Sequence, residues 1–382
     1  MKEEISVRKE AIDHWLKGEK PESIASDLGK TRQWVYKWIK RFRNNKEGNW
    51  FESETTAPKR QRTKIPLMQE NHILQIREAL ANRKYAQIGA LSIQYEYFQL
   101  GIKPPPIWTI NRVLQRNGVI NNDKARISKN IPYPIVYLSC HQMDLVGPRY
   151  LKGGYRFYSF NIIDIQTHFV HVHPITGKNA EQIIQGIICF WQTFGFPDCL
   201  QMDNELAFRG SNRYPRSLGL ILRFVLSQGV VPVFIPNAEP WRNGMVEKFN
   251  DKFNSKFYRI QEFSDFEHLK SEAKKFEDFH NQNHRYSSQS NKTPMEMLCQ
   301  NQKLSTDFVL KPFIPLEAGV IIFIRFIRSD LKITILGTHF FVKKELMYSY
   351  VVAELIIEIH TLRIKQDNQV HHVYRFVMPV NW

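Results

Sequence analysis

Three consecutive runs decide the fold class: residues 136–146 read VYLSCHQMDLV, residues 155–166 read YRFYSFNIIDIQ and residues 169–175 read FVHVHPI. All three are rich in aromatic and β-branched residues, which is typical of β-strands. After them the pattern alternates, beginning with a helix that Asn179 can cap and a strand over 198–203. Consecutive strands followed by alternating helices and strands predict a central α/β domain, a mixed sheet with helices on its faces.

Further downstream the alternation ends and the chain becomes β-rich. The remaining elements of the α/β domain are expected over 216–228, 230–235, 244–260 and 264–282. Beyond Pro312 and Pro315, strand-like runs follow over 319–328, 332–336, 338–342 and 351–359. We expect residues 316–382 to fold independently as a small C-terminal β-barrel.

Upstream, the first 50 residues predict short helices over 5–17, 21–29 and 31–42. Gly29 can close the second helix and Thr31 can cap the third, which carries several basic residues. A short helix, a glycine turn and a basic second helix are typical of a helix-turn-helix. Residues 1–50 are therefore predicted to be an all-α DNA-binding domain.

A second helical segment is predicted over 65–120. The stretch Asn44–Lys64 before it ends in the basic run KRQRTK and is typical of an exposed linker. Pro104-Pro105-Pro106 then precedes a basic helix over 107–117 that Gly118 ends. We expect a second helix-turn-helix, with or without a wing.

The composition narrows the classes of protein. The chain has 382 residues, is 43% hydrophobic and carries a net charge of +16, from 53 Lys and Arg against 37 Asp and Glu. This hydrophobic content is enough to form buried cores, so a chain that is disordered throughout is excluded. The excess of positive charge favours nucleic acid first, an anionic membrane surface second, and a basic surface without a partner last. Four cysteines without a CxxC pair, no long apolar run and no signal peptide predict a cytoplasmic protein with reduced thiols.

Three acidic residues stand at the ends of predicted elements. Asp144 ends the first strand of the α/β domain, Asp203 ends the strand over 198–203, and Glu247 lies just inside the helix over 244–260. Taken singly, each is typical of a turn, a cap or a solvated helix face. Together they can converge on one point and offer the oxygen ligands that hard divalent cations prefer.

At this point the sequence resembles a family. Residues 135–300 resemble the ribonuclease-H-like integrase core of bacterial insertion-sequence transposases and retroviral integrases. The resemblance rests on Asp144, on the turn Asp203-Asn204-Glu205 and on the block NGMVEKFN over 243–250. Two later blocks, NQNHRY over 281–286 and TPME over 293–296, are similar to the segment that follows the family's catalytic helix. Many relatives carry Asn-Gly where this chain has Asn204-Glu205, and the zinc signature of retroviral integrases is lacking.

The resemblance implies that Asp144, Asp203 and Glu247 are a catalytic triad that binds two Mg²⁺ or Mn²⁺ ions. It implies a transposase that binds the terminal inverted repeats of a mobile element, cleaves DNA and transfers strands to target DNA. The partners would then be double-stranded DNA and further copies of the chain, with no membrane, in a cytoplasmic, nucleoid-associated and bacterial setting. The tail over 316–382 would support end joining more than hydrolysis.

Basic and aromatic residues near these elements are candidates for DNA contact. On the third helix and in the linker, phosphate or base contacts are expected from Arg32, Gln33, Lys37, Lys40, Arg41, Arg43, Arg60, Arg62 and Lys64. Beside Glu247 the candidates are Trp241, Arg242, Asn243, Lys248 and Lys252. By contrast, His168, His171 and His173 are expected on a surface strand rather than around a metal.

Two other functions stay open on the sequence alone. A sequence-specific DNA-binding regulator with an idle core would share the helix-turn-helix units and the charge. A metal-dependent nuclease would cut DNA without joining it. The intact acids oppose the first, and a strand-transfer assay with pre-cut ends separates the second.

Overall fold

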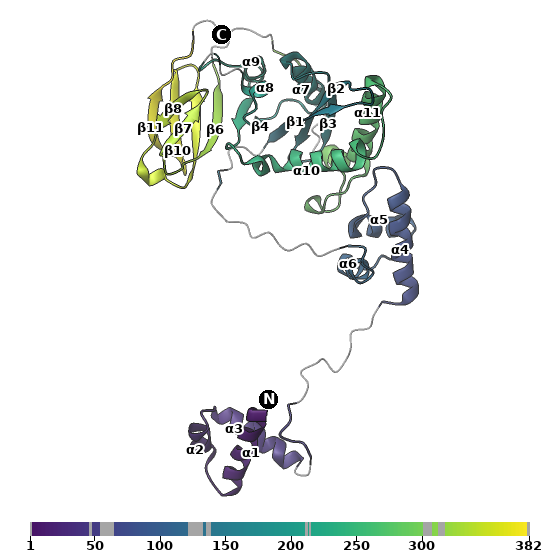
Figure 1. The fold of residues 1–382 in the computed structure, drawn as a ribbon, viewed down its shortest axis with the longest axis vertical. Helices are drawn as coiled ribbons and strands as arrows, with labels where there is room; N and C mark the ends of the chain where they lie inside the picture. Colours follow the sequence, from purple (N-terminus) through teal and green to yellow (C-terminus); the bar gives the residue numbers. More distant parts are fainter. Residues whose placement is uncertain are drawn as a thin grey trace. The chain divides into compact units, whose positions relative to one another are not determined.

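The computed structural model describes residues 2–45, 48–53, 65–120, 133–134, 139–210, 213, 215–300, 308–311 and 318–379. The chain divides into two compact units, Met1–Lys64 and Ile65–Trp382, and Figure 1 draws their elements. The predicted linker contacts Arg60, Arg62 and Lys64 lie outside the described residues.

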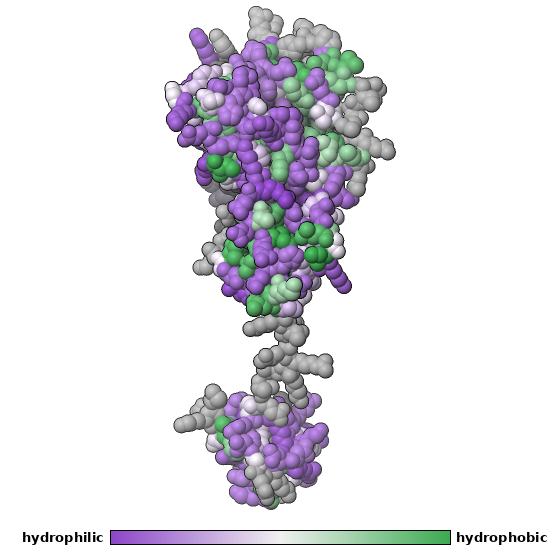
Figure 2. All heavy atoms as spheres, turned by 90° about the vertical axis from the view of Figure 1, so that its right-hand side faces the viewer, coloured by the Kyte–Doolittle hydropathy of each residue, from purple (hydrophilic) through white to green (hydrophobic). Residues whose placement is uncertain are grey.

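The first unit is a three-helix bundle of α1 (Lys2–Leu16), α2 (Pro21–Asp27) and α3 (Arg32–Asn44). Thr31 caps α3, since its side chain accepts a hydrogen bond from the backbone N–H of Trp34. Val35, Trp38 and Ile39 of α3 are buried against α1 and α2, so one face of α3 forms the core and the basic residues remain outside. The visible surface of this unit is largely hydrophilic (Figure 2).

The second unit opens with three more helices: α4 (Leu67–Asn82), α5 (Ala90–Gln99) and α6 (Ile107–Arg116). Their core contains Ile73, Ile93 and Ile110. The described residues between 65 and 120 include no strand. Apolar side chains gather on part of their surface (Figure 2), and Leu67, Met68 and Phe98 are among the exposed ones. None of the helices that the structure describes has the length and apolar character needed to cross a bilayer.

Tyr85 fixes this helical segment to the α/β domain. It lies between α4 and α5 with φ of 67°, a left-handed conformation that is costly for an aromatic residue. Its ring packs at 5.2 Å from Phe276 and 5.8 Å from Phe279. Beside it, Lys84 forms an ion pair with the nearly buried Glu272 at 2.7 Å. The packing offsets the backbone strain, so the two segments dock through specific contacts.

The α/β domain is built on a sheet of nine strands in the order β11-β10-β9-β6-β5-β4-β1-β2-β3. Its first part consists of β1 (Cys140–Tyr150), β2 (Arg156–Asp164), β3 (Val170–Ile175), α7 (Ala180–Phe194), β4 (Cys199–Met202), α8 (Leu206–Arg209), α9 (Leu220–Ser227) and β5 (Val231–Phe234). Next come a 3₁₀ turn Pro240–Asn243, α10 (Gly244–Phe253), a π-helical turn Asn254–Tyr258, α11 (Phe266–Asn283), a 3₁₀ turn Ser287–Gln289 and α12 (Pro294–Gln300). This order confirms the predicted mixed α/β core, including Asn179 as the cap of α7.

Helices cover both faces of the strands that carry the acidic residues. Residues of α7 and α9, such as Ile187 and Ile221, share one apolar core with Met143. Residues of α10 and α11, such as Phe249 and Phe276, form a second core with Val146 of the same strand (Figure 1). β1 is therefore an interior strand with little freedom, a rigid support for the residues along it.

The C-terminal region is β-rich, as predicted, but the small barrel is not confirmed. Its strands are β6 (Val320–Phe326), β7 (Lys332–Ile335), β8 (Thr338–Phe341), β9 (Tyr350–Ile356), β10 (Thr361–Gln366) and β11 (Gln369–Arg375), with a 3₁₀ turn Lys344–Leu346. β6 pairs in parallel with β5, where Val233 faces Ile322 and Phe234 faces Phe323. Four tail strands thus continue the core sheet, and β7 and β8 form a separate hairpin. The pairing replaces a self-contained barrel because β5 would otherwise offer an open edge.

Candidate active site

Register brings two of the acidic residues to one edge of the sheet. β1 and β4 are parallel, and Gln142 pairs with Gln201. Asp144 and Asp203 each stand two residues beyond that pair. The expectation that Asp144 ends its strand is wrong, because β1 runs on to Tyr150, whereas Asp203 directly follows the last residue of β4. Residues two apart share a face of the sheet. The register therefore brings both residues to the end of the parallel β1–β4 pairing.

Asp144 is the most enclosed of the three acids. The pKa of its carboxyl rises to about 7, first because burial disfavours the charged form and then because Asp203 and Glu247 lie nearby. Its Oδ2 accepts a hydrogen bond from Nδ2 of Asn250, at 2.7 Å. This carboxylate is held in place while it is kept close to protonation.

A buried amide relay orients that hydrogen bond. Asn250 lies on α10, and its Oδ1 accepts from Nδ2 of Asn161 at 2.7 Å. Oδ1 of Asn161 accepts in turn from the hydroxyl of Ser159, also at 2.7 Å. Each amide has its oxygen and nitrogen assigned by its neighbour, so Asn250 can present only its NH₂ group to Asp144.

Asp203 occupies the turn that follows β4. Its Oδ1 accepts from the backbone N–H of Glu205 at 2.9 Å, which closes the turn locally. Burial raises the pKa of Asp203, and the carboxylate of Glu205 raises it further, against a lowering by Lys178. Lys178 forms an ion pair with Glu205. The acid that replaces the usual glycine is thus neutralised by a lysine.

Glu247 depends on how the first turn of α10 is anchored. Oε1 of Gln142 accepts from the backbone N–H groups of Met245 and Val246, at 3.0 and 3.3 Å. Nδ2 of Asn243 donates to the carbonyl of Met143 at 2.9 Å, and Gln201 donates to the carbonyl of Arg242 at 3.0 Å. Gln142 of β1 and Gln201 of β4 therefore satisfy free backbone groups at the start of α10 and fix the helix to these two strands.

Charges within the site raise the pKa values of Asp144 and Glu247. Burial raises the pKa of Glu247, and Asp251 and Asp203 raise it further; Asp203 and Glu247 both raise the pKa of Asp144. Oxygen donors with mutual repulsion fit a hard divalent cation, which would relieve that repulsion. Within the described ranges, no three His, Cys, Asp or Glu side chains are gathered closely enough to hold a metal ion. Filling the site would require the side chains to draw together.

The predicted DNA contacts on α3 lie on its outer surface. Arg32, Gln33, Lys37, Lys40 and Arg43 are exposed. Arg32 forms an ion pair with Glu22 at 2.9 Å. Arg41 is half-buried, lies over the ring of Trp38 and donates to the carbonyl of Glu52. The exposed members of this group are placed for contact with a partner.

The predicted contacts beside Glu247 divide into two groups. Trp241 and Lys248 are exposed. Arg242 is held by Glu239 at 3.1 Å and by the hydroxyl of Tyr350 at 2.9 Å, and Asn243 is buried against Met143. Lys252 points inward, 2.7 Å from His284 Nε2. The structure thus gives Arg242, Asn243 and Lys252 internal partners, because α10 packs on β1 and on residues 280–286.

Sequence reasoning missed the amides that build this site. Asn250 stands three residues after Glu247, on the same face of a helix, and Asn161 interrupts an apolar strand. A polar residue in a strand that is otherwise apolar signals a buried hydrogen-bonded group. Gln142 and Gln201 each precede an acid by two residues, a repeat that could have drawn attention to both.

The histidines on and near β3 are not on a surface strand. His168 is buried, and His171 bonds to the buried Glu277 at 2.9 Å, because α11 covers β3. His280 and His284 stack at 4.6 Å, and His280 lies 3.1 Å from the Tyr286 hydroxyl. Burial lowers the pKa of His168 to about 4 and also lowers those of His280 and His284. These three rings stay neutral in the folded protein.

This neutral cluster predicts acid sensitivity. A histidine with a lowered pKa takes up its proton in the unfolded chain below pH 6.5 but not in the folded one, so stability falls as pH drops from 6.5 toward 4. At pH 5.5 each such ring would cost roughly 1 kcal/mol. Thermal unfolding between pH 7.5 and 5.5 should therefore show a smaller loss of Tm in His284→Gln than in the wild type. Parallel Tm curves for the two proteins would contradict the assignment.

Comparison with known proteins identifies two parts of the chain. Residues 2–50 match the homeodomain-like domain family, and residues 228–294 match the integrase core domain family. The search of curated proteins gave no match. The chain thus contains a homeodomain-like helix-turn-helix domain and an integrase core domain. That combination indicates a DNA-processing protein and is consistent with a transposase that has an integrase-like core.

Solved structures similar to the chain include retroviral integrase cores. The HTLV-2 integrase catalytic core domain in complex with magnesium is 17% identical in its trimeric form and 18% in its dimeric form, with TM-scores of 0.31 and 0.30. Each alignment covers 41% of this chain and 94% of the other. The catalytic core domain of BIV integrase is 16% identical, with a TM-score of 0.33, and the alignment covers 43% of this chain and 95% of that one.

Proposed function

We propose that this chain is a DNA transposase. The helix-turn-helix domain would bind the terminal repeats of a mobile element, and the integrase core would cleave DNA and join the exposed 3′-hydroxyl to a target. The second helical segment, α4 to α6, would add DNA contacts. Joining two ends calls for at least two active sites, so the active form would be an assembly of several copies on DNA.

The observation that carries this proposal is that three acids from three separate elements lie within electrostatic reach at one edge of the sheet. Asp144, Asp203 and Glu247 come from β1, from the turn after β4 and from α10; Asp203 and Glu247 raise the pKa of Asp144, and Asp203 raises that of Glu247. A structural role does not call for three repelling carboxylates in partly buried positions, whereas phosphodiester chemistry does.

In this mechanism the three carboxylates would hold Mg²⁺ or Mn²⁺. When bound, the cation supplies Lewis-acid stabilisation of the phosphodiester and activates the attacking oxygen. The chain's own contribution is orientation. Asn250 holds one oxygen of Asp144, and Gln142 fixes the first turn of α10; in the active complex this turn would direct Glu247 toward the aspartates. The rigid sheet beneath keeps this arrangement during turnover.

A strand-transfer assay tests the proposal and separates it from its rivals. The purified chain would be given pre-cut repeat DNA, a labelled target duplex and Mg²⁺ or Mn²⁺. Joined products support a transposase. Cleavage without joining would indicate a nuclease, and repeat binding with neither reaction would indicate a regulator with an idle core.

The N-terminal unit gives a separate prediction. Replacing Lys37, Lys40 and Arg41 by Ala should weaken binding to all duplex DNA and reduce the steepness of its salt dependence, because phosphate contacts release counterions. Substituting Gln33, at the start of α3, should instead reduce the preference for repeat sequence. Fluorescence anisotropy with repeat and scrambled duplexes over a salt series measures both. Wild-type affinity in the triple variant would refute the role of α3.

A further inference from the structure

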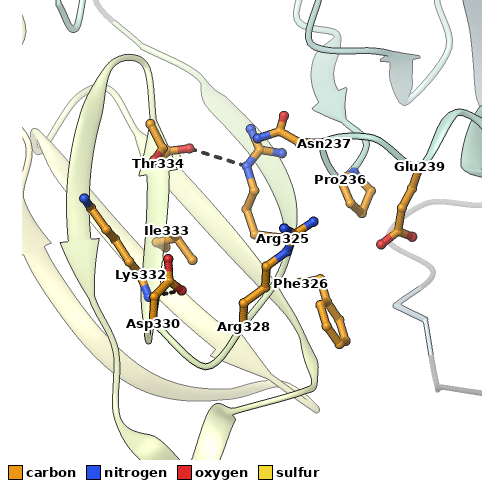
Figure 3. A pocket seen from close by; sticks show the side chains of 10 residues that line it. All are labelled: Pro236, Asn237, Glu239, Arg325, Phe326, Arg328, Asp330, Lys332, Ile333 and Thr334. Atoms are coloured by element: carbon orange, nitrogen blue, oxygen red, sulfur yellow. Dashed lines mark hydrogen bonds between the residues drawn. The ribbon is translucent and has the colours of Figure 1, made fainter.

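A buried arginine of the C-terminal region reaches the turn that carries Asp203. Arg325 lies on β6 and is 7% exposed. Its Nη2 donates to Oδ1 of Asn204 at 2.8 Å, and its Nη1 donates to the carbonyls of Ile235 and Ile324 at 3.0 and 2.9 Å. Nε lies 3.5 Å from the carbonyl of Thr334. Figure 3 shows the guanidinium between its own strand and the loop of Pro236 and Asn237.

Asn204 follows Asp203 directly, and both the oxygen and the nitrogen of its side-chain amide form hydrogen bonds. While its oxygen accepts from Arg325, its Nδ2 donates to the carbonyl of Ile235 at 2.7 Å. The backbone N–H of Ile235 donates to Met202, the residue before Asp203, at 3.1 Å. Ile235 and Arg325 therefore fix the residues on either side of Asp203, Met202 and Asn204.

The charge of Arg325 is costly where it stands. Among the described residues its hydrogen-bond partners are neutral oxygens, and none of the ion pairs there includes it. Burial and the nearby Arg209 lower the pKa of its guanidinium to about 9. A buried cation without a carboxylate is disfavoured, and an apolar side chain of similar volume would pack between the strands at less cost. An apolar residue, however, cannot donate to several acceptors at once, as the planar guanidinium fork of Arg325 does.

We propose that Arg325 is a positioning residue for Asp203, so that strand β6 of the C-terminal region forms part of the active-site scaffold. The inference rests on the proposed function, in which Asp203 binds the divalent cation. Arg325 touches neither DNA nor cation in this role. It acts through Asn204, by holding the turn in the one conformation that aims Asp203 at Asp144.

Cation binding and activity, measured on the full-length chain, test the inference. The variants are Arg325→Met, which removes the fork, and Asn204→Ala, which removes the turn contact but leaves Arg325 its bonds to Ile235 and Ile324. Arg328→Met is the matched control, because Arg328 is an exposed arginine three residues further along the chain. Isothermal titration with Mn²⁺ alone should show at least tenfold weaker binding in both variants and wild-type binding in the control. The kcat for strand transfer should fall while the KM for repeat DNA stays unchanged.

The double variant and the unfolding temperature separate positioning from simple bracing. If Arg325 acts through Asn204, adding Asn204→Ala to Arg325→Met should reduce Mn²⁺ affinity little further. Arg325→Lys keeps the charge without the fork and should restore little affinity. A variant with a lowered Tm but wild-type Mn²⁺ affinity and kcat would overturn the inference.

Failure of the proposed function would leave a distinct signature. If the wild-type chain neither binds Mn²⁺ nor joins DNA, the assignment of the acids fails, and amide hydrogen exchange then decides the role of Arg325. Exchange at residues 203–206 should be faster in Arg325→Met than in the wild type and in Arg328→Met, with no change at residues 141–145. Equal exchange in all three proteins would overturn the positioning role.

Discussion

Replacing Asp144 by Asn, Asp203 by Asn or Glu247 by Gln should each reduce cleavage and strand transfer by about a thousandfold or more. A carboxamide keeps the shape of the side chain but removes the charge that would bind the cation. The expected loss exceeds the ~10–100-fold typical of residues that only orient a ligand. Binding of repeat DNA should stay close to the wild-type level, because the helix-turn-helix unit is a separate compact unit. Gel-based cleavage and joining assays, with anisotropy for binding, measure the two effects separately.

Two neighbouring acids serve as controls for this result. Glu205 is engaged with Lys178, and Asp164 accepts from the backbone N–H and the hydroxyl of Thr167 at 2.8 and 2.6 Å. Both carboxylates are already engaged by these other partners. Glu205→Gln and Asp164→Asn should therefore retain most of the activity. Full strand transfer in any of the three candidate variants would disprove the assignment.

The core could be predicted because its local patterns and its topology agree. The apolar strands around 136–175 and the cap at Asn179 define elements that the sheet then orders in the usual way. Asp203 was placed correctly at the end of its strand, whereas Asp144 lies within β1, which the sequence pattern ended too early. The pairing of Gln142 with Gln201 explains how residues far apart in sequence come to the same edge of the sheet.

The tail could not be predicted to the same depth, since strand partners are not encoded in local patterns. Residues 320–326 read VIIFIRF, a nearly continuous apolar run, and Ile321 to Arg325 are buried. Such a run is typical of a strand covered on both faces, which already argues against the outer wall of a small barrel. The choice of β5 as its neighbour depends on an open edge that only the folded core creates.

The sequence also could not predict which side chains pack against a given face of a helix. Lys248 and Lys252 are four residues apart and predict one basic stripe, yet Lys248 is exposed and Lys252 contacts His284. The spacing gives the face of the helix but not what packs on it. In the same way, Asn250 lies on the same face of α10 as Glu247 but donates its hydrogen bond to Asp144, because α10 packs on β1.

Removal of residues 318–382 should abolish cleavage and joining together, contrary to the sequence-based expectation that joining alone would suffer most. Ile321, Ile322, Phe323 and Ile324 are each at most 2% exposed, and the rings of Phe323 and Phe234 stack at 5.0 Å. Burial of such side chains contributes about 1.5–3 kcal/mol each, so their loss is comparable with the 5–15 kcal/mol that stabilises a typical domain. The deletion also uncovers β5 and removes Arg325 from the turn of Asp203.

The matched control for this deletion is the removal of residues 1–64, which form the other compact unit. Loss of that unit should leave the unfolding transition of residues 65–382 unchanged and reduce only the affinity for repeat DNA. Circular dichroism melting and an Mn²⁺-dependent cleavage assay on both truncated proteins distinguish the two cases. A chain of residues 1–317 that unfolds cooperatively, cleaves at the wild-type rate and fails only in joining would show that the tail is an independent module. The shared sheet, the Phe234–Phe323 stack and the reach of Arg325 to Asn204 lead us to expect the opposite, a catalytic core that is complete only with its C-terminal strands.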